Sequence, residues 1–263
     1  WEMDNPKSES FVPTSAKNIF DHLTAQRVTW RYYEHGYCTL RLYERYTYNN
    51  MNIVDAGGDA ANFVSDVLDP SKQFPSVTFI DPDFINVSTG NDDQPPADIA
   101  AGQRLVGRVV DAVIRSPRWN KTLLIITYDE HGGFFDHVPP PKAPPISKEI
   151  DHYGVRLPAF VVSPWVARGR ATDIVFDHTS ILKTIIRCFL HALPPDMGER
   201  VANAKDLSEV LQPSARSDKP RIPVPPTPMR NLKLARKAEL ASEGSRDFRE
   251  LLRSVRSRAF IRT

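Results

Sequence analysis

Apolar residues recur at helical spacing in several parts of the chain. The clearest pattern covers residues 97–116, where apolar side chains follow a 3.6-residue period. Side-chain oxygens that precede a helix accept hydrogen bonds from its first turn, so we expect Asp98 to cap this helix. A helix predicted over residues 179–190 is expected to begin with either Asp177 or Thr179 as its cap. Weaker patterns of the same period predict helices over residues 15–26, 63–68 and 179–190.

Other apolar runs lack the helical period and are typical of strands. The run at 122–128, "TLLIITY", shows no alternation of polar and apolar positions, which is expected of a strand buried on both faces of a parallel sheet. Helices alternate with such runs along the sequence, and this order predicts an α/β fold with three layers. The other predicted strands are residues 28–36, 76–84 and 157–165.

Composition is that of a globular chain of 263 residues, with 41% hydrophobic and 25% charged residues. The 34 basic and 32 acidic residues nearly balance, so nothing in the overall charge indicates a nucleic-acid partner. Cys38 and Cys188 lie far apart without metal-ligand spacing, which excludes a disulfide framework and a cysteine zinc site. We expect both to be buried free thiols.

The C-terminal part differs in composition from the rest. We predict a domain over residues 1–211 and, over residues 212–263, a proline-rich linker followed by a basic, helix-prone tail. A basic helix can lie on an anionic membrane, so peripheral membrane contact is one interpretation. A solvated surface helix is the other, because Gly244 interrupts a short apolar face.

Titratable side chains gather where the run at 122–128 ends. Asp129 and Glu130 follow it directly, and we expect them at the carboxyl end of a central parallel strand, facing a cleft. Crowded carboxylates repel one another unless a proton or a cation neutralises them, so a divalent metal ion is the simplest partner. Gly132 and Gly133 would let the backbone turn tightly and approach an anion closely. Alternatively, the two acids only cap a turn and His137 packs under the proline run.

A longer stretch, "TLLIITYDEHGGFFDHVPPP", closely resembles the signature of the phosphoesterase family that includes bacterial non-haemolytic phospholipase C, bacterial acid phosphatases and plant non-specific phospholipase C. The resemblance continues in the family's order through "PSVTFIDPDF", "PPADIAAGQRLV", "GVRLPAFVVSPW" and "DHTSILKTI". It implies an alkaline-phosphatase-like three-layer α/β sandwich and metal-dependent hydrolysis of phosphate esters, with phospholipids among the substrates. It also suggests an extracellular or periplasmic location. The metal is left open among calcium, manganese, zinc and iron.

The resemblance also implies roles for single residues. Asp129 and Glu130 match the metal-binding Asp-Glu pair, and Glu130 or a histidine would protonate the leaving alkoxide. His137 is expected to contact phosphate or a ligand, with Asp136 orienting it through a hydrogen bond, although a structural turn is equally compatible with both. The roles of two more residues stay open: His178 faces a bound phosphate or merely follows a helix cap, and Arg156 pairs with a phosphate or with a structural carboxylate.

Two departures from the family pattern affect the expected activity. Neither an ENRSFD-type metal-binding segment nor a TxPNR-type nucleophile segment occurs in the sequence, so it resembles the C-terminal portion of the family domain, incomplete at the N-terminus. Gln94 stands where many members have a histidine. We therefore expect a phosphoric ester hydrolase of the phospholipase C or acid phosphatase type whose isolated chain is weak or inactive. The alternatives are an inactive remnant that serves as a binding or interaction module, and a metal-binding module without hydrolysis.

Overall fold

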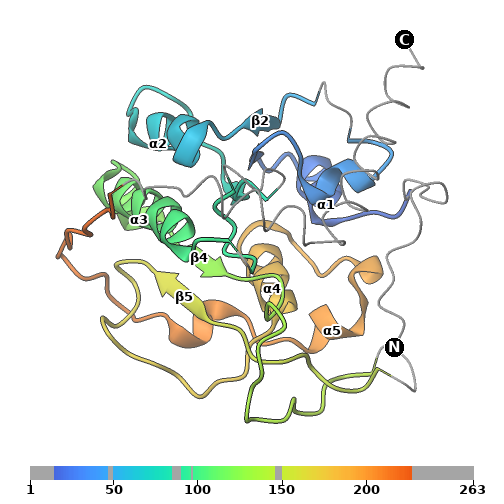
Figure 1. Ribbon diagram of the computed structural model, residues 1–263. Helices are drawn as coiled ribbons and strands as arrows, with labels where there is room; N and C mark the ends of the chain where they lie inside the picture. Colours follow the sequence, from blue (N-terminus) through green and yellow to red (C-terminus); the bar gives the residue numbers. More distant parts are fainter. Residues whose placement is uncertain (1–14, 47–49, 85–89, 96, 146–149, 227–263) are drawn as a thin grey trace, which may run out of the picture.

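The computed structural model describes residues 15–46, 50–84, 90–95, 97–145 and 150–226, and its strands and helices form an α/β fold (Figure 1). Within these ranges the predicted helices and strands are all present, with boundaries shifted by a few residues. A strand at Ile53–Asp55, inside a stretch with no clear periodic signal, and a helix at Gly198–Asn203 were not predicted. The elements in chain order are α1 (Ile19–Ala25), β1 (Trp30–Glu34), β2 (Ile53–Asp55), α2 (Ala61–Leu68), β3 (Val77–Ile80), α3 (Ile99–Arg115), β4 (Leu124–Thr127), β5 (Ala159–Val162), α4 (His178–Phe189) and α5 (Gly198–Asn203).

Three strands form a parallel sheet in the order β2-β1-β3, with Tyr32 of β1 opposite Ile53 on one side and Phe79 on the other. The prediction of a parallel partner for residues 122–128 is wrong: β4 pairs with β5, and the pair is antiparallel. Both were also expected to be buried, yet every residue of β4 is partly exposed and Phe160 of β5 is 60% exposed. An apolar run reports a preference for burial but carries no information about the direction of its partner strand.

The predicted caps of α3 and α4 are confirmed. A carboxylate oxygen of Asp98 accepts a hydrogen bond from the Ala100 amide at 3.0 Å. Asp177, rather than Thr179, caps α4, because its carboxylate accepts from the Ser180 amide while the Ser180 hydroxyl bonds the Asp177 amide. Such reciprocal capping satisfies amides that the first helical turn leaves without partners. It also fixes His178 as the first residue of α4.

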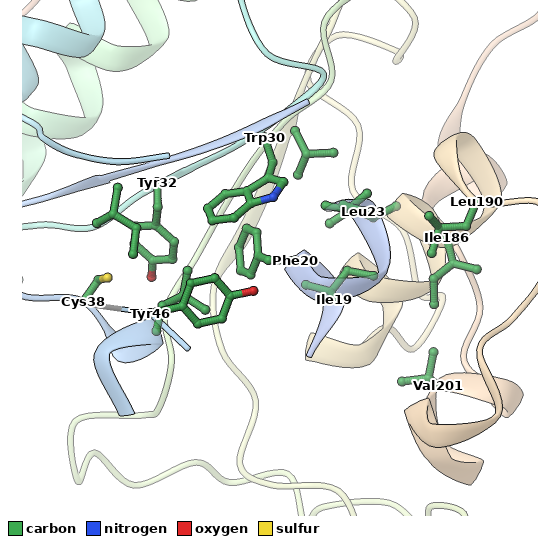
Figure 2. Packing of buried hydrophobic residues seen from close by; sticks show 14 residues of the cluster. Ile19, Phe20, Leu23, Trp30, Tyr32, Cys38, Tyr46, Ile186, Leu190 and Val201 are labelled. Carbon is green, nitrogen blue, oxygen red and sulfur yellow. The ribbon is translucent and has the colours of Figure 1, made fainter. Parts of the chain in front are cut away.

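Aromatic packing on one face of β1 joins this strand to α1, and α4 adds aliphatic side chains to the same cluster (Figure 2). Phe20 of α1 lies against Trp30 with ring centroids 4.7 Å apart, and Tyr32 stacks on Phe79 of the neighbouring strand at 5.6 Å. Aromatic pairs of this kind contribute about 0.5–1.5 kcal/mol beyond the burial of their area. Ile186 of α4 belongs to the same cluster.

The opposite face of β1 is covered by α2 and α3. Tyr33 of β1 is fully buried there and packs edge-on against Phe63 of α2, at a centroid distance of 5.4 Å. The same cluster includes Val109 and Val113 of α3, and the partly buried Leu124 of β4 packs against it. Both sheets therefore pack in one cluster with α3, which fixes their position relative to each other.

The segment expected to be a linker lies against the domain over its described part, residues 212–226. The Gln212 amide donates to the Trp165 carbonyl at 2.6 Å, Arg104 of α3 donates to the Pro225 carbonyl at 2.6 Å, and Ile222 packs on the core. An extended, proline-rich chain can therefore cover a helix without regular structure of its own. The boundary at residue 211 stays a prediction, and the proposed basic helix lies in residues 227–263, outside the described residues.

Two further expectations concern single features. Cys38 is buried as predicted, but Cys188 is exposed near the end of α4, so the prediction that both thiols are buried is wrong. Position 188 belongs to an amphipathic helix whose last turn reaches the surface, and helical spacing alone does not place that end. Within the described ranges, no helix has the length and hydrophobicity needed to cross a membrane.

Candidate functional site

The Asp129–Glu130 turn begins two residues after β4 ends. Both side chains are exposed, and each accepts a hydrogen bond from a nearby amide: Asp129 from the Glu130 N–H at 3.0 Å and Glu130 from the Gly132 N–H at 2.6 Å. Gly132 and Gly133 have φ values of 64° and 76°, which other residues adopt only with strain. The turn therefore has the tight glycine backbone that the sequence predicted, at the end of an antiparallel strand.

Neither carboxylate lines either of two cavities in the described part of the chain. One, of about 300 Å³, lies between β1, β2 and α2 and is lined by Tyr33, Asp55 and Lys72 among others. The other, of about 340 Å³, lies beside the start of β4 against Trp165 and Leu211. The expectation that both acids face a cleft therefore finds no support in these cavities, and the expected central parallel strand beneath them is the antiparallel β4.

Tyr128, the residue directly before the acids, is held from two distant parts of the chain. The His178 Nε2 lies 2.8 Å from the Tyr128 carbonyl oxygen, and because a carbonyl oxygen only accepts, the imidazole is the donor. The Tyr128 hydroxyl donates to Asp93 Oδ2 at 2.8 Å. The "DHTS" motif and the "NDDQPP" loop therefore both contact the end of β4. Gln94, exposed in that loop, sits next to Asp93.

Asp93 has a left-handed backbone conformation and a closely packed side chain. Its φ is 62°, and its Oδ1 is buried without a hydrogen-bond partner among the described residues. The side chain lies against Gly102 of α3, where a Cβ atom would come within 2.1 Å of Oδ1. Burial raises the pKa of the Asp93 carboxyl. A glycine in α3 thus makes room for the residue that binds Tyr128.

Asp81 is a member of this region that the sequence analysis did not single out. It follows β3 directly, and burial raises the pKa of its carboxyl to about 6. The negative charges of Glu34 and Asp129 raise it further, while a hydrogen bond from the Tyr32 hydroxyl at 2.8 Å opposes the rise. The ends of β1, β3 and β4 therefore bring three carboxylates close enough to interact. An acid directly after a parallel strand was the signal that could have found Asp81.

His35 connects the segments that follow β2 and β3 at the carboxyl edge of the parallel sheet. Its Nδ1 lies 3.1 Å from the Asp81 carbonyl oxygen and its Nε2 lies 2.8 Å from the Gly57 carbonyl oxygen. The preceding Glu34 forms a buried ion pair with Arg41, with 2.6 Å between Oε1 and Nη2. A buried carboxylate without such a partner would be costly, so the Arg41 guanidinium compensates for the burial of Glu34 at this edge of the sheet.

Asp136 and Arg156 form a bidentate ion pair. Arg156 Nε and Nη2 donate to the two Asp136 carboxylate oxygens at 2.8 and 2.9 Å. This pairing holds the pKa of the Asp136 carboxyl well below its usual range, and a hydrogen bond from the Val138 amide lowers it further. His137 is 83% exposed, and its Nδ1 lies 3.6 Å from Asp136 Oδ1, too far for a hydrogen bond. Asp136 therefore orients Arg156 and the local backbone rather than the imidazole.

The donor set for a metal ion is incomplete among the residues that the structure describes. No group of three or more His, Cys, Asp or Glu side chains is placed there to hold a metal ion. Asp129 and Glu130 offer carboxylate oxygens on adjacent residues, which suit hard and borderline divalent cations. These residues alone do not make a metal site, and further ligands would have to come from elsewhere.

Comparison with known proteins decides the family. The sequence profile of the Phosphoesterase family matches residues 2–190. The chain belongs to the phosphoesterase family. Asp81, Asp129, Glu130, Asp136 and His178 of this phosphoesterase all lie within the matched residues, whereas residues 212–226 lie beyond them.

Relatives of this phosphoesterase carry the name phospholipase C. Non-specific phospholipase C6 of Arabidopsis thaliana is 41% identical over 139 residues, which cover 44% of this chain and 26% of that protein. Non-specific phospholipase C5 of the same plant is 36% identical over 186 residues, covering 63% of this chain and 34% of the relative. Non-hemolytic phospholipase C of Pseudomonas aeruginosa is 30% identical over 153 residues, which cover 48% of this chain and 22% of the relative. The phosphoesterase chain thus spans 22% to 34% of the length of these relatives.

Proposed function

We propose that this chain forms the acid-bearing part of a phosphoric ester hydrolase of the phospholipase C or acid phosphatase type. One observation carries the proposal: in a phosphoesterase chain, the Asp129–Glu130 turn follows β4 and is anchored by His178 from a second family motif. Carboxylates, an imidazole and a glycine turn are the groups that phosphate ester hydrolysis uses. The phospholipase C names of the relatives favour a phospholipid substrate.

Asp129 and Glu130 would hold a divalent cation together with ligands outside the described residues, and that cation would neutralise phosphate charge. Glu130 or the exposed His137 protonates the leaving alkoxide. Gly133, where an added Cβ would meet nothing within 4 Å, leaves room for the phosphate beside the backbone, and Gly132 gives the turn its positive φ.

Three other residues support the turn. His178 holds it through the Tyr128 carbonyl, and when the ring carries both protons its Nδ1–H is left to donate to a phosphate. The Asp136–Arg156 pair fixes the loop that carries His137. These contacts limit the positions that the acid and the imidazole can take, which is the purpose of supporting groups around a reacting centre.

We also propose that the nucleophile and the remaining metal ligands lie outside these 263 residues, on TxPNR-type and ENRSFD-type segments. The complete domain would be an alkaline-phosphatase-like three-layer sandwich. Helices already pack on both faces of β1, which supports that arrangement. The chain alone should then hydrolyse phosphate esters poorly, because groups that act as a unit lose most of their effect when one is absent.

The test compares the 263-residue chain with a longer form that carries both segments. Each is assayed with added Mn²⁺, Ca²⁺ or Zn²⁺ against an aryl phosphate, a phosphodiester and phosphatidylcholine. We expect turnover by the longer form and little or none by the chain alone. Robust turnover by the chain, abolished by Asp129→Asn, would place a nucleophile within it and contradict this part of the proposal.

A second function, a binding module without hydrolysis, is favoured by two observations. The described residues do not assemble three metal ligands, and Gln94 offers an amide where the family has an imidazole. Metal content and activity separate the two functions. A longer form that hydrolyses none of the three substrates is such a module, and stoichiometric binding of a divalent ion would make it a metal-binding one.

A further inference from the structure

Two adjacent phenylalanines stand out from the surface beside the Asp129–Glu130 turn. Phe134 is 69% exposed and Phe135 is 93% exposed. Single exposed apolar residues are common, but two large aromatic neighbours at one loop tip form an apolar projection that water solvates poorly. They lie only a few residues after the proposed site.

The local backbone holds the two rings in this exposed position. The Phe134 amide donates to the His131 carbonyl at 3.2 Å, which closes a turn around the two glycines. A Cβ atom at Gly132 would lie 3.2 Å from the Phe134 ring, so this ring packs directly on the glycine backbone. The positive φ of both glycines lets the chain reverse and leave Phe135 at the tip.

We propose that Phe134 and Phe135 form an interfacial anchor that inserts into a phospholipid bilayer. The inference rests on the proposed function: an enzyme that acts on a phospholipid must bring its site to the membrane surface, and these rings share a loop with the proposed acids. Aromatic side chains partition favourably into the boundary between head groups and acyl chains. The anchor would place Asp129 and Glu130 at the depth of the phosphate groups.

The charges of the loop indicate the kind of bilayer. Asp129 and Glu130 are negative and exposed, and the nearby Arg156 is already paired with Asp136. Residues 129–137 carry acids and histidines but no Lys or Arg that could attract anionic lipids. The anchor therefore suits a zwitterionic surface such as phosphatidylcholine, and added phosphatidylserine should not strengthen binding.

Flotation of the full 263-residue chain with phosphatidylcholine vesicles tests the anchor. Two side chains give weak, reversible binding, so the lipid is titrated to millimolar concentration. We expect Phe135→Ser to weaken partitioning about tenfold, from the apolar area that it removes, and Phe135→Leu to retain most of it. Met51→Ser is the matched control, because Met51 is 91% exposed elsewhere on the chain and should not affect binding.

Several results would overturn the proposal. Wild type that stays unbound at all lipid concentrations would do so, as would Phe135→Ser that floats like wild type, or Met51→Ser that loses as much binding. A wild-type dimer that Phe135→Ser turns into a monomer, without vesicle binding, would show that a second copy covers the rings. Hydrolysis of a water-soluble aryl phosphate by the longer form is measured in parallel. Activity there without vesicle binding would reject the anchor alone, whereas binding without activity would reject the proposed function.

Discussion

The His178 imidazole and the Tyr128 carbonyl meet at 2.8 Å, although 50 residues separate them in the sequence. The contact joins the first residue of α4 to the end of β4, directly before Asp129. Asp177 fixes the start of α4 by capping it, so the position of the imidazole follows from the cap. One hydrogen bond thereby links two family motifs that the sequence shows only as separate stretches.

Replacing His178 with alanine should loosen this link. The carbonyl would lose its donor, and we expect the free energy of unfolding to fall by about 0.5–1.5 kcal/mol. Each kcal/mol lost lowers the melting temperature of a chain of this size by about 2–4 °C. Amide exchange at residues 129–133 should rise. His178→Gln keeps an N–H donor of similar reach and should restore most of both. Equal exchange in wild type, His178→Ala and His178→Gln would show that the contact does not hold the turn.

Gly102→Ala should destabilise the fold although alanine favours helices. Its Cβ would lie 2.1 Å from Asp93 Oδ1, so Asp93 must move and its bond to Tyr128 must weaken. We expect the free energy of unfolding, measured by urea denaturation, to fall by about 1–3 kcal/mol. Gly107→Ala in the same helix is the matched control, because its nearest neighbour is a proline carbon at 3.1 Å. If Gly102→Ala were as stable as Gly107→Ala, the close packing of Asp93 on α3 would be wrong.

Asp81 should make the stability depend on pH. The pKa of its carboxyl is raised to about 6 in the folded chain, so the folded state binds the proton more tightly than the unfolded state does. The stability that this proton binding adds to the folded state is fully present below the unfolded pKa of about 3.9 and is lost as pH rises through about 6. Asp81→Asn carries no such charge. By urea denaturation, the free energy of unfolding of Asp81→Asn should exceed that of wild type by about 1–3 kcal/mol at about pH 7.5 and by little at about pH 4. A gain of the same size at both pH values would contradict the assignment.

The Asp136–Arg156 pair should show the opposite pH dependence. Because Arg156 holds the pKa of the Asp136 carboxyl below its usual range, its contribution is present above the unfolded pKa and is lost as pH falls through the folded value. Asp136→Asn should therefore be less stable than wild type at neutral pH and approach it in acid. The same denaturation series measures this, and a variant that is least stable relative to wild type in acid would exclude the ion pair as the cause.

Helices were predictable from the sequence because their signals are local. Asp98 and the 3.6-residue period of residues 97–116 lie within one short stretch, and the structure has α3 at 99–115. Side-chain caps and amphipathic spacing act between neighbours in the chain. The strand β1 was likewise recognisable from its run of aromatic residues.

Strand partners and the surroundings of the acids were not predictable, because they depend on distant residues. Nothing within residues 122–128 distinguishes an antiparallel partner from a parallel one. The burial of Asp81 and its interaction with Asp129 arise only when two sheets pack against α3. The sequence therefore located the Asp129–Glu130 turn, while the third carboxylate beside it became visible only in the fold.

The most direct test of the proposed site is hydrolysis of an aryl phosphate by the longer form, with Asp129→Asn compared to Asp177→Asn. Both variants remove one negative charge, but Asp177 caps α4 and asparagine caps helices nearly as well. We predict that Asp129→Asn lowers kcat/KM by about 10³-fold or more. Asp177→Asn should keep most of the activity. A longer form in which Asp129→Asn hydrolyses the substrate as fast as wild type would show that Asp129 has no part in the chemistry.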